Sequence, residues 1–210
     1  MLLRSFEQNE RQQALVSGGN VTIPITVPGY DTWTEMENAP ADEREKNFIL
    51  ALDAVKHERT ILSPAEALNV ITVGAQHHDS VKTRPQIFNA IDPFQSNSLP
   101  NMSSGLGLGY RRMIKPDVYL PGGREYVRMR SSGGGATISF GEPQKLFGLC
   151  AAVPDRSNRG RLDQIALTDG TSSATALATR AGHLIFDELM NVEDGSLWPA
   201  RSFVPVVQLV

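Results

Sequence analysis

The residues best suited to chemistry are Gly170-Thr171-Ser172-Ser173-Ala174, where a serine stands between a glycine turn and an apolar segment. The stretch 174–190 contains no proline and is rich in alanine and leucine, so we expect a helix there. Thr171 or Ser172 can cap this helix, and the unpaired N–H groups of its first turn favour negative charge. Because a nucleophilic serine must become an alkoxide, Ser172 is a candidate nucleophile, although the same turn also begins many ordinary helices.

A nucleophilic serine needs a base, and the four histidines of the chain offer no obvious one. His183 follows Ser172 by eleven residues, which is about 16 Å along a helix that rises 1.5 Å per residue. His57 is expected at the end of a helix, where it interacts favourably with the helix dipole. The run His77-His78-Asp79 resembles a metal or catalytic cluster, but neighbouring side chains of an extended segment point to opposite faces. We therefore interpret this run as a polar turn.

Two glycine-rich runs invite comparison with nucleotide-binding loops. The run 105–109 lacks the third-glycine spacing of a dinucleotide fingerprint, and the run 131–135 is not followed by the lysine and serine of a phosphate loop. We interpret both as loops and expect no cofactor. No further ligands stand at zinc-binding spacing, so we also expect no metal.

The composition is that of an ordinary soluble globular protein. The chain has 210 residues, 40% of them hydrophobic and 20% charged, so a single domain is the simplest expectation. A net charge of −3 argues against a nucleic-acid partner. The amino terminus becomes charged too early for a signal peptide, and no apolar stretch approaches the roughly 20 residues that span a bilayer. We expect a cytoplasmic protein without a membrane partner, and we expect the only cysteine, Cys150, to be buried.

The elements that would position Ser172 alternate between helix and buried strand, which predicts an α/β layered fold. The segment 21–40 contains three prolines and predicts an extended surface excursion, and 76–109 is expected to be mostly loop. Strands are expected at 14–17, 70–75, 116–120, 136–140 and 147–153, the last two paired antiparallel, and helices at 2–13, 42–57, 63–68 and 174–190.

Four separated segments, in order, resemble the subtilisin-like serine peptidases, or subtilases. Gly170-Thr171-Ser172-Ser173-Ala174 is similar to the Gly-Thr-Ser-x-Ala nucleophile motif of that family. The other three matches are the turn Val16-Ser17-Gly18-Gly19-Asn20, the strand Asn69-Val70-Ile71-Thr72-Val73-Gly74-Ala75, and Ile114-Lys115-Pro116-Asp117-Val118 with Leu120-Pro121-Gly122-Gly123. The resemblance implies a three-layer α/β/α subtilisin-like fold with a mostly parallel sheet. It covers 1–210 as a partial catalytic domain, strongest over 15–190, with 191–210 as a truncated tail.

The resemblance also implies roles for individual residues. Ser172 would be the nucleophile, and the Asn20 amide together with the Ser172 N–H would bind the oxyanion, with Gly170 and the Thr171 hydroxyl in support. Residues Ser17, Gly18 and Gly19 would form part of the wall that receives a substrate side chain. Ala176 replaces the proline that the family has shortly after the serine, and Gly18 stands where alanine is usual.

The family's aspartate and histidine precede the asparagine, in Asp-Ser/Thr-Gly and His-Gly-Thr contexts, and residues 1–19 contain neither residue type. We therefore expect a serine endopeptidase present as a fragment, inactive until an amino-terminal segment or chain supplies both residues. Peptides or proteins would be its substrates. Two alternatives remain open: a non-catalytic module that binds peptides or a partner protein on the same scaffold, and an unrelated hydrolase that pairs Ser172 with His78 and Asp79.

Overall fold

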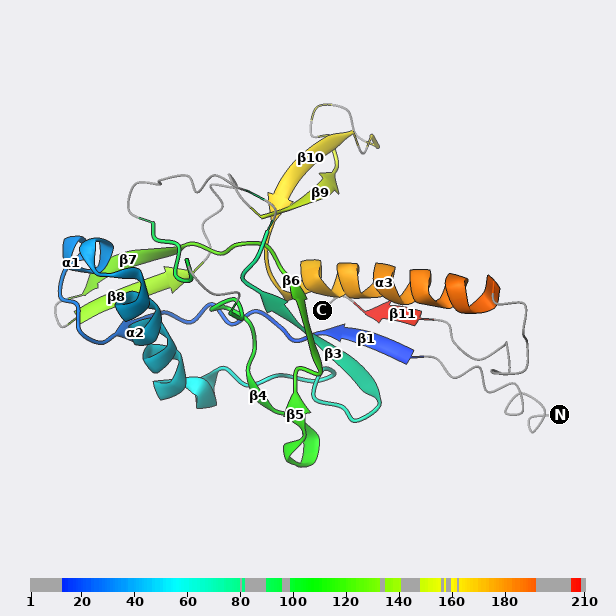
Figure 1. Cartoon of the computed structure of the whole chain (residues 1–210), viewed down its shortest axis with the longest axis horizontal. Helices are drawn as coiled ribbons and strands as arrows, with labels where there is room; N and C mark the ends of the chain where they lie inside the picture. Colours follow the sequence, from blue (N-terminus) through cyan, green and yellow to red (C-terminus); the bar gives the residue numbers. More distant parts are fainter. Residues whose placement is uncertain are drawn as a thin grey trace.

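The computed structural model describes residues 13–79, 81, 90–95, 99–132, 135–140, 148–155, 157, 160–161, 163–191 and 205–208. The predicted helix at 2–13 lies outside these residues except for Gln13, which begins a strand. The described chain forms a parallel sheet with a long helix at one side and a smaller antiparallel sheet with two helices at the other (Figure 1).

The larger sheet consists of parallel strands in the order β11-β1-β3-β6. Their bounds are β1 (Gln13–Ser17), β3 (Val70–Gln76), β6 (Val118–Pro121) and β11 (Pro205–Gln208). The register pairs Val16 with Thr72 and Val73 with Val118. Central strands of a parallel sheet are covered on both faces, which fits the β-branched run Val70-Ile71-Thr72-Val73 of β3.

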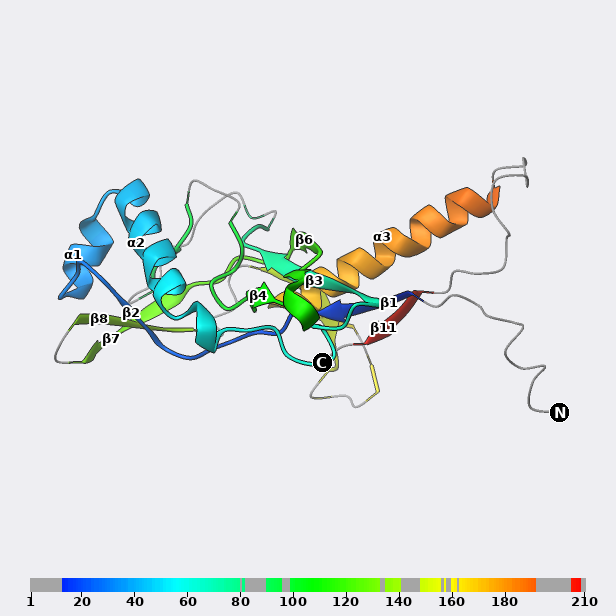
Figure 2. The same ribbon diagram turned by 90° about the horizontal axis from the view of Figure 1, so that it is seen from below.

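Helix α3 (Thr171–Asn191) lies against one face of this sheet (Figure 2). Its small residues Ala174 and Ala178 are buried against Leu15 and Val73, and they allow the helix to approach the sheet closely. The predicted α/β fold, with its parallel sheet and its helix after the serine turn, is confirmed.

The other core is formed by a segment that we expected to be an extended surface excursion. It contains β2 (Ile25–Val27), which pairs antiparallel with β8 (Gly135–Phe140), and β8 pairs in turn with β7 (Val127–Ser132). Helices α1 (Trp33–Asn38) and α2 (Ala41–Ala54) lie on this sheet (Figures 1 and 2). The side chains of Met36, Phe48 and Ile138 are fully buried there. The prolines interrupt regular structure only locally, because the apolar residues between them enter a core.

Three further predictions are wrong. Strand β9 (Leu149–Val153) pairs with β10 (Gln164–Thr168) in a projecting hairpin, and not with β8 (Figure 1). Cys150 lies on this hairpin and is exposed, because a two-stranded hairpin has no layer to cover both of its faces. The segment 63–68 forms turns and no helix.

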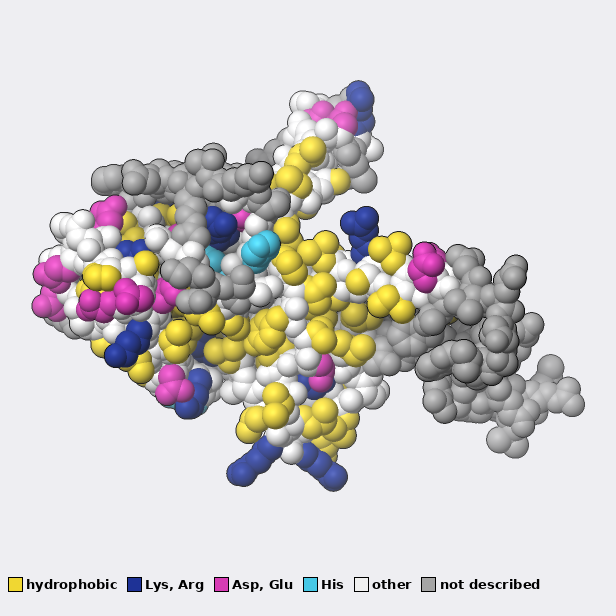
Figure 3. Space-filling view, viewed as in Figure 1, with side chains coloured by type: hydrophobic (Ala, Val, Ile, Leu, Met, Phe, Trp, Pro, Cys, Tyr) yellow, Lys and Arg dark blue, Asp and Glu magenta, His cyan; other side chains and the backbone are white. Residues whose placement is uncertain are grey.

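The remaining elements are a short hairpin and two 3-10 helices. The short strands β4 (Gly107–Leu108) and β5 (Ile114–Lys115) form a hairpin around the 3-10 helix η2 (Tyr110–Arg112), and a second 3-10 helix, η1 (Lys56–Glu58), follows α2. Figure 3 shows apolar side chains across the face where β6 is the edge strand, and Val118 and Tyr119 are each 39% exposed there.

The close contact of α3 with the sheet predicts a position-specific effect of added volume. Ala174 is fully buried, so Ala174→Leu should lower the free energy of unfolding by about 1–3 kcal/mol through overpacking. Urea unfolding measures the change. Ala176→Leu is the matched control, because Ala176 is exposed on the same helix; equal destabilisation by both variants would contradict the packing described.

Candidate active site

The serine turn places Ser172 in the first turn of α3. Gly170 has a φ of +111°, a conformation that glycine adopts without strain, and its N–H donates to Gly122 O at 2.7 Å. Helix α3 begins at the next residue, and Ala174 N–H donates to Gly170 O at 3.3 Å. Ser172 is half-buried, and its N–H has no partner among the described residues. This leaves a backbone donor and the positive end of the helix dipole beside the serine.

Asn20 contacts this turn from the loop that follows β1. Its Oδ1 accepts hydrogen bonds from Thr171 N–H at 3.0 Å and from the Thr171 hydroxyl at 3.1 Å. Since these donors occupy the carbonyl end of the amide, its Nδ2 remains available to donate to another group. A Cβ at position 170 would lie 2.8 Å from Nδ2, so a glycine is needed for the amide to come this close.

The other predicted site residues support the same contact. The Ser17 and Thr171 hydroxyls share a hydrogen bond of 2.7 Å, while Gly18 N–H donates to Val73 O at 2.8 Å. Gly19 O accepts from Gly105 N–H at 2.9 Å. The Thr171 hydroxyl thus lies between Asn20 and Ser17, where it orients the amide. The supporting role at the oxyanion that the resemblance implies for this hydroxyl stays a prediction.

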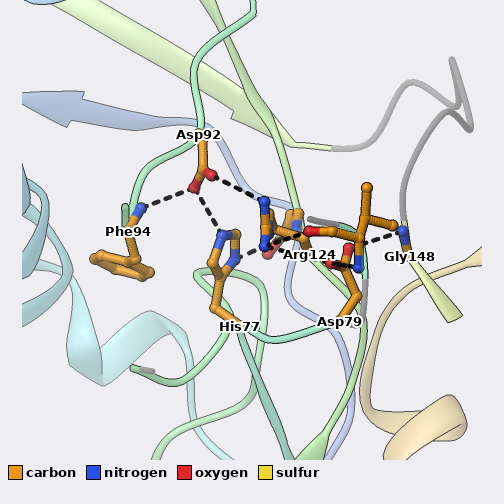
Figure 4. A network of polar contacts seen from close by, with 8 residues as sticks. His77, Asp79, Asp92, Phe94, Arg124 and Gly148 are labelled. Carbon is orange, nitrogen blue, oxygen red and sulfur yellow. Dashed lines mark hydrogen bonds and ion pairs between the residues drawn. The ribbon is translucent and has the colours of Figure 1, made fainter. Parts of the chain in front are cut away.

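No described histidine is hydrogen-bonded to Ser172. His57 and His78 are exposed, as is His183 on α3. His77 is buried, and both of its ring nitrogens are engaged (Figure 4). Its Nε2 lies 2.8 Å from Asp92 Oδ1, and its Nδ1 accepts Glu125 N–H at 3.3 Å. Because Nδ1 is the acceptor, the proton of the neutral ring is on Nε2 and is donated to Asp92.

Asp79 is also buried, and this overturns the interpretation of 77–79 as a polar turn. Its carboxylate accepts Gly148 N–H at 3.0 Å and Val81 N–H at 3.0 Å, and it lies 3.3 Å from Arg124 Nη2 (Figure 4). The Asp79 carboxylate is therefore engaged with these groups and not with His78. The pairing of Ser172 with His78 and Asp79 that an unrelated hydrolase would require is absent from the described residues. Alternation along an extended segment places the side chains of 77 and 79 on one face and that of 78 on the other, but it did not predict that the shared face would be buried.

Comparison with known proteins identifies the family of the chain. A model of the subtilase family (peptidase S8) matches residues 4–202. The chain belongs to the subtilase family. No curated protein and no solved structure matches it. Subtilases are serine-type peptidases, and this is the general class of hydrolase that the domain represents.

The Lys-Pro-Asp segment of this subtilase has a structural role. The buried Lys115 Nζ donates to Val70 O at 2.8 Å and pairs with Asp117 Oδ2 at 2.6 Å. The same oxygen of Asp117 accepts Thr72 N–H at 2.7 Å. The pair therefore ties the beginning of β6 to β3.

Sequence reasoning missed a buried pair of opposite charge close to the Asn20 loop. Arg59 follows η1 and is fully buried; its Nη2 donates to Val21 O at 2.9 Å and to Met102 O. Glu125 follows β6, and its Oε2 accepts Ser103 N–H at 2.9 Å. Nothing in the sequence around either residue distinguishes it from a surface charge.

The surroundings of Glu125 change its acidity. Burial raises the pKa of its carboxyl from 4.5 to about 7, and the negative charge of Asp169 adds to this rise. The hydrogen bond from Ser103 N–H and the positive charge of Arg59 act in the opposite direction. Burial also lowers the pKa of Arg59, and Glu125 opposes that change.

Two kinds of feature are absent from the described residues. Across the part of the chain that the structure describes, no helix is long and apolar enough to cross a membrane. The same residues include no group of three or more His, Cys, Asp or Glu side chains that could hold a metal ion.

The close approach of Asn20 to the serine turn predicts that position 170 tolerates no side chain. Gly170→Ala forces a positive φ on alanine and places its Cβ against the amide, so the variant should lose more than about 1 kcal/mol of unfolding free energy. Thermal unfolding measures this. Gly182→Ala is the control on α3, where a Cβ meets open space, and it should stabilise the helix by about 0.5–1 kcal/mol. Equal Tm changes of one sign would refute the contact.

The raised pKa of Glu125 predicts a pH dependence of stability. An acid whose folded pKa lies above its unfolded value binds its proton more tightly in the folded protein. Its stabilising contribution is complete below pH 4.5 and is lost as the pH rises to about 7. At about 1.4 kcal/mol for each pH unit between the two values, the loss is about 3 kcal/mol. Urea unfolding at several pH values should show this slope, and Glu125→Gln should flatten it.

Proposed function

We propose that this subtilase domain is the serine-bearing part of an endopeptidase site that forms an acyl-enzyme at Ser172. The observation that carries the proposal is the orientation of Asn20, whose Oδ1 is held by Thr171 while its Nδ2 remains available. An amide donor beside the unpaired N–H of Ser172 makes two donors that converge where negative charge would develop.

In this reaction Ser172 Oγ attacks the peptide carbonyl carbon, and the Oγ proton passes to a base. The carbonyl oxygen becomes the oxyanion, which the Asn20 amide and the Ser172 N–H stabilise. Collapse of the tetrahedral intermediate expels the amine, which takes up the proton, and leaves an ester on Ser172. Water then repeats the sequence and releases the carboxylate. Ser17, Gly18 and Gly19 would line the adjacent wall for a substrate side chain.

The base and its carboxylate partner would come from another segment or chain that carries them in Asp-Ser/Thr-Gly and His-Gly-Thr contexts. This part of the proposal is supported by the four histidines, of which three are exposed and His77 is committed to Asp92 and Glu125. Without these partners Ser172 would be nearly inert, because losing members of a triad costs several orders of magnitude in rate. The cytoplasm remains the proposed compartment, since a single cysteine needs no oxidising environment.

Because no described histidine is hydrogen-bonded to Ser172, a second candidate function is also favoured. It is a non-catalytic module that binds peptides or a partner protein on this scaffold. In that case peptide affinity would be independent of the Ser172 hydroxyl. Peptide binding that is unchanged by Ser172→Ala, in a chain that no partner activates, would distinguish the module from the enzyme.

A fluorophosphonate probe, which bonds covalently to an activated serine, tests the proposed nucleophile. We expect labelling of this chain when it is mixed with a segment encoded immediately upstream that carries the two missing motifs. Ser172→Ala should abolish labelling, and Asn20→Ala should slow it by about 10²–10³, the effect on kcat measured for such a donor in subtilisin, a member of this family. Mass spectrometry locates the labelled residue.

Ser173→Ala is the matched control, because this hydroxyl lies in the same first turn of α3 and should be dispensable. Labelling that persists in Ser172→Ala, or that is equally lost in Ser173→Ala, would rule out the assigned nucleophile. Absence of any labelling with every such segment would leave the binding module as the function.

A further inference from the structure

We infer that Arg59 and Glu125 are positioning residues that hold Asn20 in place as an oxyanion donor, acting through residues 101–104. The inference rests on the proposed function for its catalytic meaning. The positions of the residues are independent of that function.

Arg59 connects the two segments that meet at Asn20. Its guanidinium donates to Val21 O, on the residue directly after Asn20, and to Met102 O on the neighbouring segment. The guanidinium carbon also lies 5.2 Å from the centre of the Phe140 ring. One nitrogen of the guanidinium, Nη2, therefore binds two carbonyls from segments that are distant in sequence.

Glu125 holds the opposite side of the same junction. Its Oε2 accepts Ser103 N–H, and Ser103 O accepts Val21 N–H at 2.6 Å. The next residue, Ser104, forms an antiparallel bridge with Asn20 itself. A chain of hydrogen bonds thus runs from Val21, the residue after Asn20, through Ser103 to the buried carboxyl of Glu125. Ser104, the bridge partner of Asn20, directly follows Ser103 in the chain.

Stability alone does not account for this pair. Arg59 Nε and Nη1 are buried without a hydrogen-bond partner among the described residues, which is costly for a charged group. An apolar side chain of similar volume would avoid this cost. What an apolar side chain could not supply is the hydrogen bonding that sets the Asn20 loop.

Charged groups from every neighbouring element surround the junction. Asp169, immediately before the serine turn, interacts electrostatically with Glu125, and Arg59 faces it with the opposite charge. His77 accepts the Glu125 N–H, and its other nitrogen leads through Asp92 to Arg124 and Asp79 (Figure 4). The Glu125 carboxyl is therefore hydrogen-bonded to Ser103 beside the Asn20 loop, and it is coupled electrostatically to Asp169, the residue that leads into the Ser172 turn.

A double-mutant cycle tests whether Arg59 acts through Asn20. With the activated chain, Arg59→Met should slow fluorophosphonate labelling of Ser172 about tenfold, a partial loss of one oxyanion donor. In the Asn20→Ala background the same substitution should change the rate less than about twofold, because the group that it positions is gone. Equal effects in both backgrounds would overturn the inference.

Arg44→Met is the matched control for loss of a buried arginine. Arg44 is buried in the same core and donates to the carbonyls of Met36, Glu37 and Ala39, all far along the chain from Asn20. It should leave the labelling rate unchanged. If Arg59→Met does not fold, Arg59→Lys takes its place; it keeps a positive charge and a donor on a side chain of different shape, and it should give an intermediate rate in the same cycle.

Amide hydrogen exchange separates failure of this inference from failure of the proposed function. The Thr171 N–H is protected by Asn20 Oδ1, so it should exchange about tenfold faster in folded Arg59→Met or Arg59→Lys and at the unchanged rate in Arg44→Met. This readout needs no activity, and it supports the inference even if Ser172 is never labelled. Unchanged Thr171 exchange in the Arg59 variants would overturn the positioning role even where labelling succeeds.

Discussion

The bond from Thr171 N–H to Asn20 Oδ1 is the contact on which the arrangement of this site depends. It joins the loop after β1 to the first turn of α3, across 151 residues of sequence. It satisfies one of the orphan amides at the helix start, and it orients the Asn20 amide so that its nitrogen is left to donate. Gly170 permits this contact because it has no Cβ and adopts a positive φ.

The surrounding structure can be understood as support for that contact from two directions. On one side, Gly122 O, just after strand β6 of the parallel sheet, accepts the Gly170 N–H and so holds the serine turn. The small residues of α3 bring the helix close to the same sheet. On the other side, Arg59 has its guanidinium carbon 5.2 Å from the centre of the Phe140 ring of the antiparallel sheet, and it binds the backbone beside Asn20. The buried polar groups near His77 lie between these two parts, where unpaired charges would be costly, and they are correspondingly interlinked.

Much of the layered fold was predictable, because its strands and its long helix have distinctive local patterns. The β-branched run of β3 and the proline-free helix after Ser172 were assigned correctly from their own residues. The antiparallel sheet was missed because β2 is three residues long and lies among prolines, so only its burial against Phe48 and Ile138 makes it a strand. Strand partners were the weakest prediction, because β8 and β9 have similar composition and pairing depends on the layers available to cover them.

By itself, the sequence determined which residues could perform chemistry: a serine after a glycine turn and an asparagine after a buried strand, in segments whose order matches the subtilases. Only the tertiary structure decided how they are oriented. It placed the Thr171 hydroxyl on Asn20 rather than towards a substrate, turned His77 and Asp79 inward, and buried Arg59 and Glu125 beside the site. The physical reason is that hydrogen bonding and burial are properties of the surroundings, and these come from segments that local patterns do not connect.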